Sequence, residues 1–152
     1  MQLIRKEYQI LQFDVRNNYD AILYIKENYA DYVFRCCYIP CFDLYDSNSV
    51  IPKVGDYING YICIKYAFPD KHIPILYELL LGEYRKDSVS ERIYARGLVK
   101  EILSPYEIII SLNDLGNVLV KYEEISFYNI DEECLVYGEL HLDTIDESGH
   151  FD

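Results

Sequence analysis

The sequence predicts an α+β protein, mainly an antiparallel curved sheet or small β-barrel with two short helices. Two stretches within the first 90 residues repeat their apolar side chains at helical spacing, whereas the chain after residue 90 alternates apolar and polar side chains as strands do. Turns rich in Asn, Asp and Gly separate these runs. The length of 152 residues suits a single domain, 1–152, and 51% apolar composition is enough for a core.

The first 40 residues are expected to form a strand, a helix and a second strand. Residues 2–14 fit either period, and their β-rich composition favours a strand. Apolar residues then recur at helical spacing in 19–30, after Asn and Asp side chains that can cap a helix. The run 32–39 is dense in β-formers and ends at Pro40, which predicts the second strand.

The middle of the chain is predicted to contain a long loop, a strand and a second helix. Residues 41–56 are rich in Asp, Ser, Asn, Pro and Gly, so we expect a surface loop. Alternation in 57–66 indicates a strand with one apolar and one Tyr-rich face. Residues 73–84 place Pro74 in a first turn and an apolar stripe before Gly82, which is typical of a short helix.

After residue 90 the pattern indicates strands throughout. Gly97 interrupts the alternation of 93–102, so this strand is expected to contain a β-bulge. A turn at 113–117 then joins two alternating runs into a hairpin, and one more alternating run completes the sheet. The hairpin strands and the last strand are expected at 106–112, 118–122 and 134–143.

Two parts of the chain resemble an OB-fold, which is a five-stranded Greek-key barrel. One is Ala95-Arg-Gly-Leu-Val-Lys-Glu-Ile102, continued by Leu115-Gly-Asn-Val-Leu-Val120. The other, Val54-Gly-Asp-Tyr-Ile-Asn-Gly60, is similar to the opening of an S1-type RNA-binding barrel. The resemblance implies a ligand-binding module for oligonucleotides or oligosaccharides, in which Tyr57 and Tyr61 would form the platform that stacks bases or sugars.

The net charge of −12 resides entirely in the last third of the chain. Residues 1–100 contain 13 acidic and 13 basic side chains, whereas 101–152 contain 13 acids and the single cation Lys121. A field segregated in this way repels nucleic acid phosphates and attracts a basic partner. We therefore expect the acidic third, 101–152, to bind a basic protein, and nucleic acid to be disfavoured.

Acidic residues and tyrosines lie close together in this third of the chain, as they do on surfaces that bind another protein. Fixed carboxylates can imitate nucleic acid phosphates, and tyrosines are favoured interface anchors. Small acidic proteins of this make-up include immunity or antitoxin-type inhibitors that occlude the active site of a basic toxin, typically a nuclease. The alternative is a soluble protein whose surface happens to be acidic, and the clustering favours the inhibitor. The residues expected to bind the partner are Glu123, Glu124, Asp131, Glu132, Glu133, Glu139, Asp143, Asp146, Glu147, Tyr122, Tyr128 and Tyr137.

Five cysteines raise the question of a metal site or a nucleophile. The cluster at 36–41, with His72 or His141, could supply four zinc ligands. Adjacent cysteines of a strand point to opposite faces, however, so small core residues with free thiols are favoured. The sequence ties no histidine to a cysteine, which leaves a catalytic pair without support. The five are Cys36, Cys37, Cys41, Cys63 and Cys134.

Other chemistry has little support, and we expect no enzyme activity, no cofactor and no metal. Glu139, His141 and Asp143 share one face of the last predicted strand and could bind a metal or act as acid and base, but a solvated sheet face is the favoured interpretation. Phosphate-binding loops and hydrolase motifs are absent. With no signal peptide and no apolar run long enough to span a membrane, we expect a cytoplasmic protein.

Overall fold

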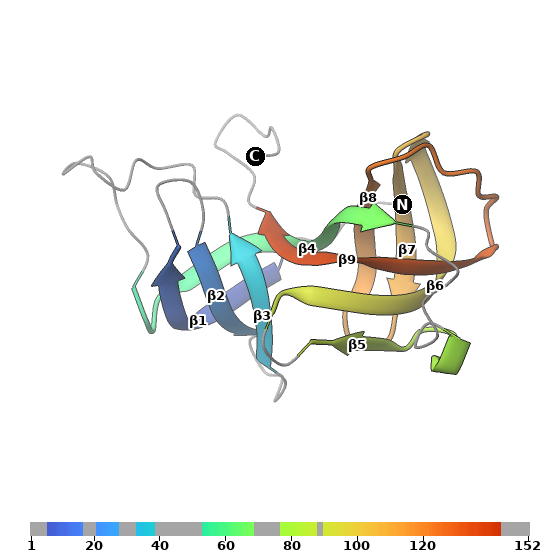
Figure 1. The fold of residues 1–152 in the computed structure, drawn as a ribbon. Coiled ribbons are helices and arrows are strands. Elements are labelled where there is room, and N and C mark those ends of the chain that lie inside the picture. The colour runs from blue at the N-terminus through green and yellow to red at the C-terminus, as the bar shows by residue number, and fades with distance from the viewer. Residues whose placement is uncertain are drawn as a thin grey trace. The chain divides into compact units, whose positions relative to one another are not determined.

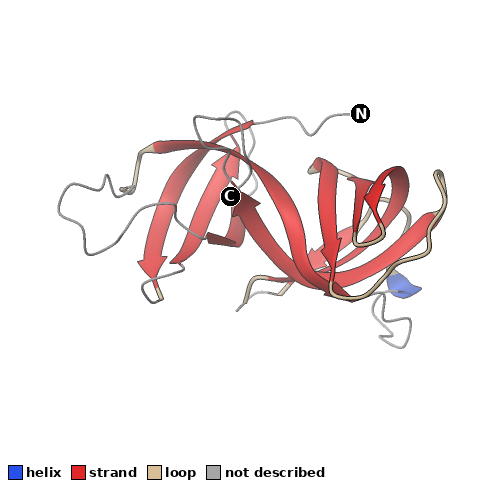
Figure 2. Cartoon of the chain, turned by 90° about the horizontal axis from the view of Figure 1, so that it is seen from above, coloured by secondary structure: helices blue, strands red, loops and turns tan. Residues whose placement is uncertain are grey.

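The computed structural model describes residues 6–16, 21–27, 33–38, 53–68, 77–87 and 90–143. Strands account for 70% of these residues (Figures 1 and 2), so the protein is nearly all β and the predicted α+β fold class is wrong. The strands are β1 (Lys6–Val15), β2 (Ala21–Glu27), β3 (Val33–Tyr38), β4 (Tyr57–Phe68), β5 (Tyr84–Lys86), β6 (Arg92–Ser104), β7 (Glu107–Leu112), β8 (Gly116–Tyr122) and β9 (Glu133–Asp143).

The helix predicted at 19–30 is replaced by strand β2 in the described residues. This strand pairs with β1 on one side and with β3 on the other. Four of its first five side chains are buried, and such a continuous apolar run suits a strand paired on both sides as well as it suits a helix. The pairing with the strands directly before and after it in the chain therefore decides the conformation.

The helix predicted at 73–84 is wrong as well. Residues 73–76 lie outside the described residues, and of the rest only Tyr77 and Glu78 have helical geometry. The chain then turns at Gly82, whose φ of 90° is one that glycine adopts readily, and enters β5. No helix in the described part of the chain is long and apolar enough to cross a membrane.

The predicted strands are confirmed where the structure describes them. Strands β1, β3 and β4 lie within or across the runs 2–14, 32–39 and 57–66, and β6 to β9 form the strands expected after residue 90. Of the loop predicted at 41–56, only residues 53–56 belong to the described part. Alternation and turn residues thus suffice to locate these strands, including β4 and β9, whose pairing partners lie far away in the chain.

An irregularity of the kind expected in β6 is present, but Gly97 does not mark it. The pairing of β6 with β7 shifts register at two points beyond Val99, while Gly97 stays in register with Cys134 of β9. A Cβ atom at Gly97 would lie only 3.0 Å from the side chain of Ile110. The glycine is therefore required for close packing inside the sheet.

Contacts divide the chain into two compact units. One is built around Ile62–Leu140, and the other around Arg5–Tyr61 and the chain from His141 onward. Strands β4 and β9 contribute residues to both units. The single domain expected over 1–152 stays a prediction.

In the unit around Ile62–Leu140 the strands pair in a closed cycle. β6, β7 and β8 form an antiparallel meander, and β8 pairs in parallel with β4. β4 neighbours β9, which returns antiparallel to β6, and β5 adds a short edge. This order is compatible with a small barrel. Fully buried side chains of this unit include Ile64, Ile93, Ile108, Ile110, Val118, Val120 and Val136.

The other unit repeats the same pairing order, with β1, β2 and β3 in place of β6, β7 and β8. β1, β2 and β3 form an antiparallel meander, and the end of β3 pairs in parallel with β9, where Cys37 faces His141. The start of β4 pairs antiparallel with β1. A buried hydrogen bond of 3.3 Å from the Tyr61 hydroxyl to the Asp143 carboxylate links β4 to β9 in this unit.

Candidate functional site

Five of the predicted partner residues, four acids and Tyr128, lie on one loop, which joins β8 to β9. We name residues 123–132 the acidic loop, because they carry four acids and no basic side chain. All four acids are exposed. The loop therefore carries two pairs of exposed carboxylates, one at each of its ends. The four acids are Glu123, Glu124, Asp131 and Glu132.

Hydrogen bonds order the backbone of the acidic loop. The N–H and the Oγ of Ser126 both donate to the carbonyl oxygen of Pro105, at 2.8 and 3.1 Å. The Val99 N–H donates to the carbonyl oxygen of Glu132 at 2.9 Å, which fixes the other end of the loop on β6. Between these points, the Asn129 N–H donates to the Glu132 carboxylate at 2.8 Å. An ordered loop gives up little conformational entropy when a partner binds.

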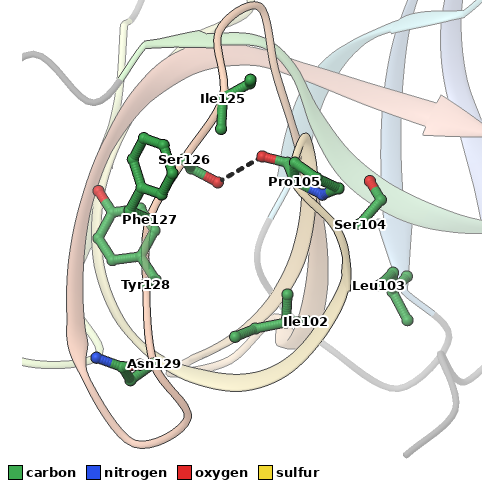
Figure 3. Close-up of a pocket in the computed structure, with 9 residues that line it drawn as sticks. All are labelled: Ile102, Leu103, Ser104, Pro105, Ile125, Ser126, Phe127, Tyr128 and Asn129. Carbon is green, nitrogen blue, oxygen red and sulfur yellow. Dashed lines mark hydrogen bonds between the residues drawn. The ribbon is translucent and has the colours of Figure 1, made fainter.

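A hollow of about 620 Å³, lined mainly by apolar residues, lies between the acidic loop and the end of β6 (Figure 3). We name it the apolar hollow. Residues 102–105 form one wall and residues 125–129 the other. Phe127 is 88% exposed, the highest value among the large apolar side chains of the described residues, and Leu103 and Ile125 are about half exposed. Exposed apolar surface beside charged residues is typical of interaction sites.

Glu133, the next predicted partner residue, is held by an ion pair. Its Oε2 accepts hydrogen bonds from Nη2 and Nε of Arg96, at 2.6 and 3.1 Å. The same guanidinium donates through Nη1 to the carbonyl oxygen of Leu79 at 2.9 Å. The Arg96 guanidinium thus offsets much of the charge of Glu133, and this carboxylate stabilises the folded unit.

Tyr122, predicted to contact a partner, belongs to the core. Its hydroxyl lies 2.8 Å from the Sγ atom of Cys134, and its ring stacks on half-buried Tyr128 with 6.0 Å between centroids. Burial, followed by the proximity of Cys134, raises the pKa of both tyrosines above the usual 10.0. Burial also raises the pKa of the Cys134 thiol above 9.0. All three groups therefore stay neutral at physiological pH.

Tyr137 and Glu139 lie further along β9 and are both half-buried. The Tyr137 ring stacks on Tyr94 with 4.9 Å between centroids, and the Arg92 guanidinium lies 5.3 Å from its centre. Glu139 stands opposite Arg92 in the pairing of β9 with β6. This corner of the sheet carries a cation beside its acid.

The end of β9 is buried, which corrects the interpretation of its polar face as solvated. His141 is 2% exposed and Asp143 is 4% exposed. The Asp143 carboxylate accepts its hydrogen bond from Tyr61, so it stabilises its unit instead of offering charge to a partner. Asp146 and Glu147 lie outside the described residues.

The part of the chain that the structure describes contains no candidate metal-binding site. No three His, Cys, Asp or Glu side chains lie close enough there to hold a metal ion. The prediction of buried free thiols is confirmed for four of the five cysteines, whereas Cys41 and His72 fall outside the described residues. The four are Cys36, Cys37, Cys63 and Cys134.

The tyrosine platform expected for an OB-like module does not form as a pair. Tyr57 is 55% exposed, but Tyr61 is 3% exposed and its hydroxyl is bound to Asp143. A buried ring cannot stack on a base or a sugar. Tyr57 is the one member of the pair that a ligand could reach.

The apolar hollow was not predicted from the sequence. Its exposed members Ile125 and Phe127 stand among acids in a run with no regular period, so they belong to no strand face. Large apolar side chains within an acidic, non-periodic run are the signal that could have revealed this surface.

No protein-family model, no curated protein and no solved structure matches this chain. Its function is therefore inferred from the acidic loop, the apolar hollow and the order of its strands.

Proposed function

We propose that this protein is a non-enzymatic acidic binding protein, an immunity or antitoxin-type inhibitor that neutralises a basic toxin, such as a nuclease, by occluding its active site. The acidic loop carries the proposal, because it exposes four carboxylates without a cation on an ordered backbone. Cationic sites that bind phosphates also bind carboxylates through charge-assisted hydrogen bonds. Such a loop can therefore compete with nucleic acid for a nuclease active site.

The apolar hollow beside the loop supports this function. Tight interfaces combine an apolar centre that excludes water with a charged or polar rim. Phe127 and Ile125 supply apolar surface within the same ten-residue segment that supplies the acids. The partner surface is accordingly narrower than the sequence suggested, since Tyr122 and Glu133 are engaged inside the protein.

Affinity capture from the native cell at low salt, with elution by a salt gradient, tests the proposal. We expect the wild-type chain to retain one basic protein in stoichiometric amount and to inhibit its activity. The variant Glu123→Lys/Glu124→Lys should lose the complex, because it changes the charge of the loop by four units. Glu7→Lys, on the exposed face of β1, is the matched control and should retain it. Capture of no stoichiometric protein, or equal capture by the double variant, would count against an inhibitor that acts through this loop.

An OB-like ligand-binding module for oligonucleotide or oligosaccharide is the second candidate, and the strand order favours it. In both units an antiparallel meander of three strands has its last strand parallel to another, and two further pairings complete the cycle. That connectivity is the one expected of an OB-type Greek-key barrel, whose loops bind such ligands. The acidic loop disfavours phosphates, so oligosaccharides are the more compatible class.

Thermal unfolding in the presence of oligosaccharides and single-stranded DNA tests this second candidate. A ligand that binds the native state raises the midpoint by mass action. We expect an oligosaccharide to raise it, and Tyr57→Ala to abolish the increase if the exposed ring is part of the binding site. A chain unaffected by any of these ligands would leave the inhibitor as the better proposal.

A further inference from the structure

The exposed phenylalanine of the acidic loop is presented by a fixed backbone. Phe127 follows Ser126, which is bound twice to Pro105, and it precedes the turn that Asn129 closes with Glu132. A large apolar ring that is 88% exposed gains nothing for folding, since it buries almost no surface. Its position is thus suited to a contact that another molecule completes.

The apolar hollow has the size and lining to receive a protein side chain. At about 620 Å³ it falls within the range of ordinary ligand sites. Ile102 and Leu103 line the wall from β6, and Ile125 and Phe127 line the wall from the acidic loop (Figure 3). Ser104 adds a hydroxyl near the apolar surface. An aliphatic or aromatic side chain would bury these exposed groups together.

Charge restricts what can enter the hollow. The walls themselves, 102–105 and 125–129, carry no charged side chain, but Glu101 and Glu124 flank them directly, and Glu123, Asp131 and Glu132 lie on the rest of the acidic loop. Anionic ligands are therefore repelled, and so is a second copy of this chain with its net charge of −12. A cationic segment gains from the same field.

We infer that the apolar hollow is the docking site for a segment of a basic protein that carries one large apolar side chain flanked by lysines or arginines. The apolar side chain packs between Ile102 and Phe127, and the flanking cations face Glu123, Glu124 and Asp131. This inference rests on the proposed inhibitor function and specifies how the partner is recognised.

Three peptides of about nine residues test the inference directly. The first has lysines around a central leucine, the second has the same lysines around serine, and the third has glutamates around leucine. Each is titrated into the isotopically labelled full chain, and the backbone amide signals are followed by NMR. We expect the first peptide to bind at the signals of 102–105 and 125–129, at least about tenfold more tightly than the second. The third should not bind.

Variants separate this inference from the proposed function. Phe127→Ser removes a side chain that the fold does not bury, and should weaken the first peptide at least about tenfold. Tyr77→Ser, at an aromatic ring that is 59% exposed and does not line the hollow, is the matched control and should bind normally. Equal binding of the leucine and serine peptides would contradict docking in the apolar hollow, but it would be consistent with an inhibitor that binds its partner through charge. Failure of both lysine peptides would overturn both proposals, and a dimer abolished by Phe127→Ser would assign the hollow to self-association instead.

Discussion

The tyrosines of this protein include rings buried in the core, such as Tyr122, and rings exposed on the surface, such as Tyr57. Among the tyrosines expected at the partner surface, Tyr122 is buried, with its hydroxyl on the Cys134 thiol, and Tyr128 stacks against it. In a chain without tryptophan and with only six phenylalanines, such rings fill the core. Sequence pattern cannot separate a buried tyrosine from an exposed one, because the same ring suits both environments.

The Tyr122, Tyr128 and Cys134 cluster predicts a loss of stability in alkali. All three have a raised pKa in the folded state, so the unfolded chain releases protons that the folded chain retains. The free energy of unfolding is therefore unaffected by these groups below about pH 8 and falls above it, first through the thiol and then through the tyrosines, by up to about 1.4 kcal/mol per pH unit for each group. Urea unfolding at a series of pH values between 7 and 11 measures this dependence.

The variant Tyr122→Phe tests the assignment of that slope. At neutral pH it should lower the free energy of unfolding by about 1 kcal/mol, since it removes the hydroxyl beside Cys134. Above pH 10 its stability should fall less steeply than that of the wild type. Tyr57→Phe, at an exposed ring, is the matched control and should keep the wild-type slope. Identical slopes for Tyr122→Phe and the wild type would show that the cluster does not govern the alkaline transition.

At the scale of elements, Arg96 connects β6 to two other parts of its unit. Its guanidinium binds both the Glu133 carboxylate on β9 and the Leu79 carbonyl. We expect Arg96→Ala to lower the free energy of unfolding by about 1–2 kcal/mol, because a partly buried charge-assisted contact and a carbonyl partner are lost together. Glu133→Gln should cost less than about 1 kcal/mol.

The ion pair between Arg85 and Glu78 is the comparison for Arg96. Its nitrogen and oxygen lie 3.2 Å apart, and both side chains are more than half exposed. Arg85→Ala should therefore change the free energy of unfolding by less than about 0.5 kcal/mol. Chemical denaturation of the three variants ranks these contacts, and an Arg85 variant as unstable as the Arg96 variant would contradict the argument from burial.

Sequence patterns predicted those strands whose side-chain pattern and turn residues do not also fit a helix. The β7 to β8 hairpin has an apolar, largely β-branched run in each strand and a turn with Asp114 and Gly116 at positive φ, and both features are legible in the sequence. Strand β2 was mistaken for a helix because its buried run is short and nearly continuous, and only its pairing with β1 and β3 decides the matter. The acids of the loop were predicted as residues of a partner surface. The apolar hollow was not predicted, because it forms where β6 approaches the loop, and no local pattern encodes that approach.

At the scale of the whole molecule, the two long strands β4 and β9 explain how one chain builds two similar pairing cycles. They have 12 and 11 residues, roughly twice the length of a typical strand of 5–6. A glycine lies at a close approach between them in each unit: Gly60 against the backbone of Asp143, and Gly138 against that of Lys65. A Cβ atom at either position would collide with the neighbouring strand. The sequence does not reveal why these glycines are needed, because each close approach is made by residues far apart along the chain.

The segregated charge has a consequence for the stability of the free protein. The exposed acids of the acidic loop have no basic side chain on the loop itself, so they repel one another, and this repulsion favours unfolding, which separates the charges. Salt screens it, because the Debye length falls from about 30 Å at 10 mM to about 8 Å at 150 mM ionic strength. The midpoint of thermal unfolding should therefore rise by a few degrees over this range.

The origin of that salt effect can be located with the charge variants of the acidic loop. Glu123→Lys/Glu124→Lys should raise the midpoint at 10 mM salt and reduce the further increase at 150 mM, since it removes repulsion at the densest part of the field. Glu7→Lys, in the balanced part of the chain, should leave the increase unchanged. A double variant that loses its partner yet is more stable alone would show that the acids are retained for binding at a cost in stability. A midpoint that does not depend on salt would mean that the acids are too far apart in space to form one field, and the proposed partner surface would lose its electrostatic basis.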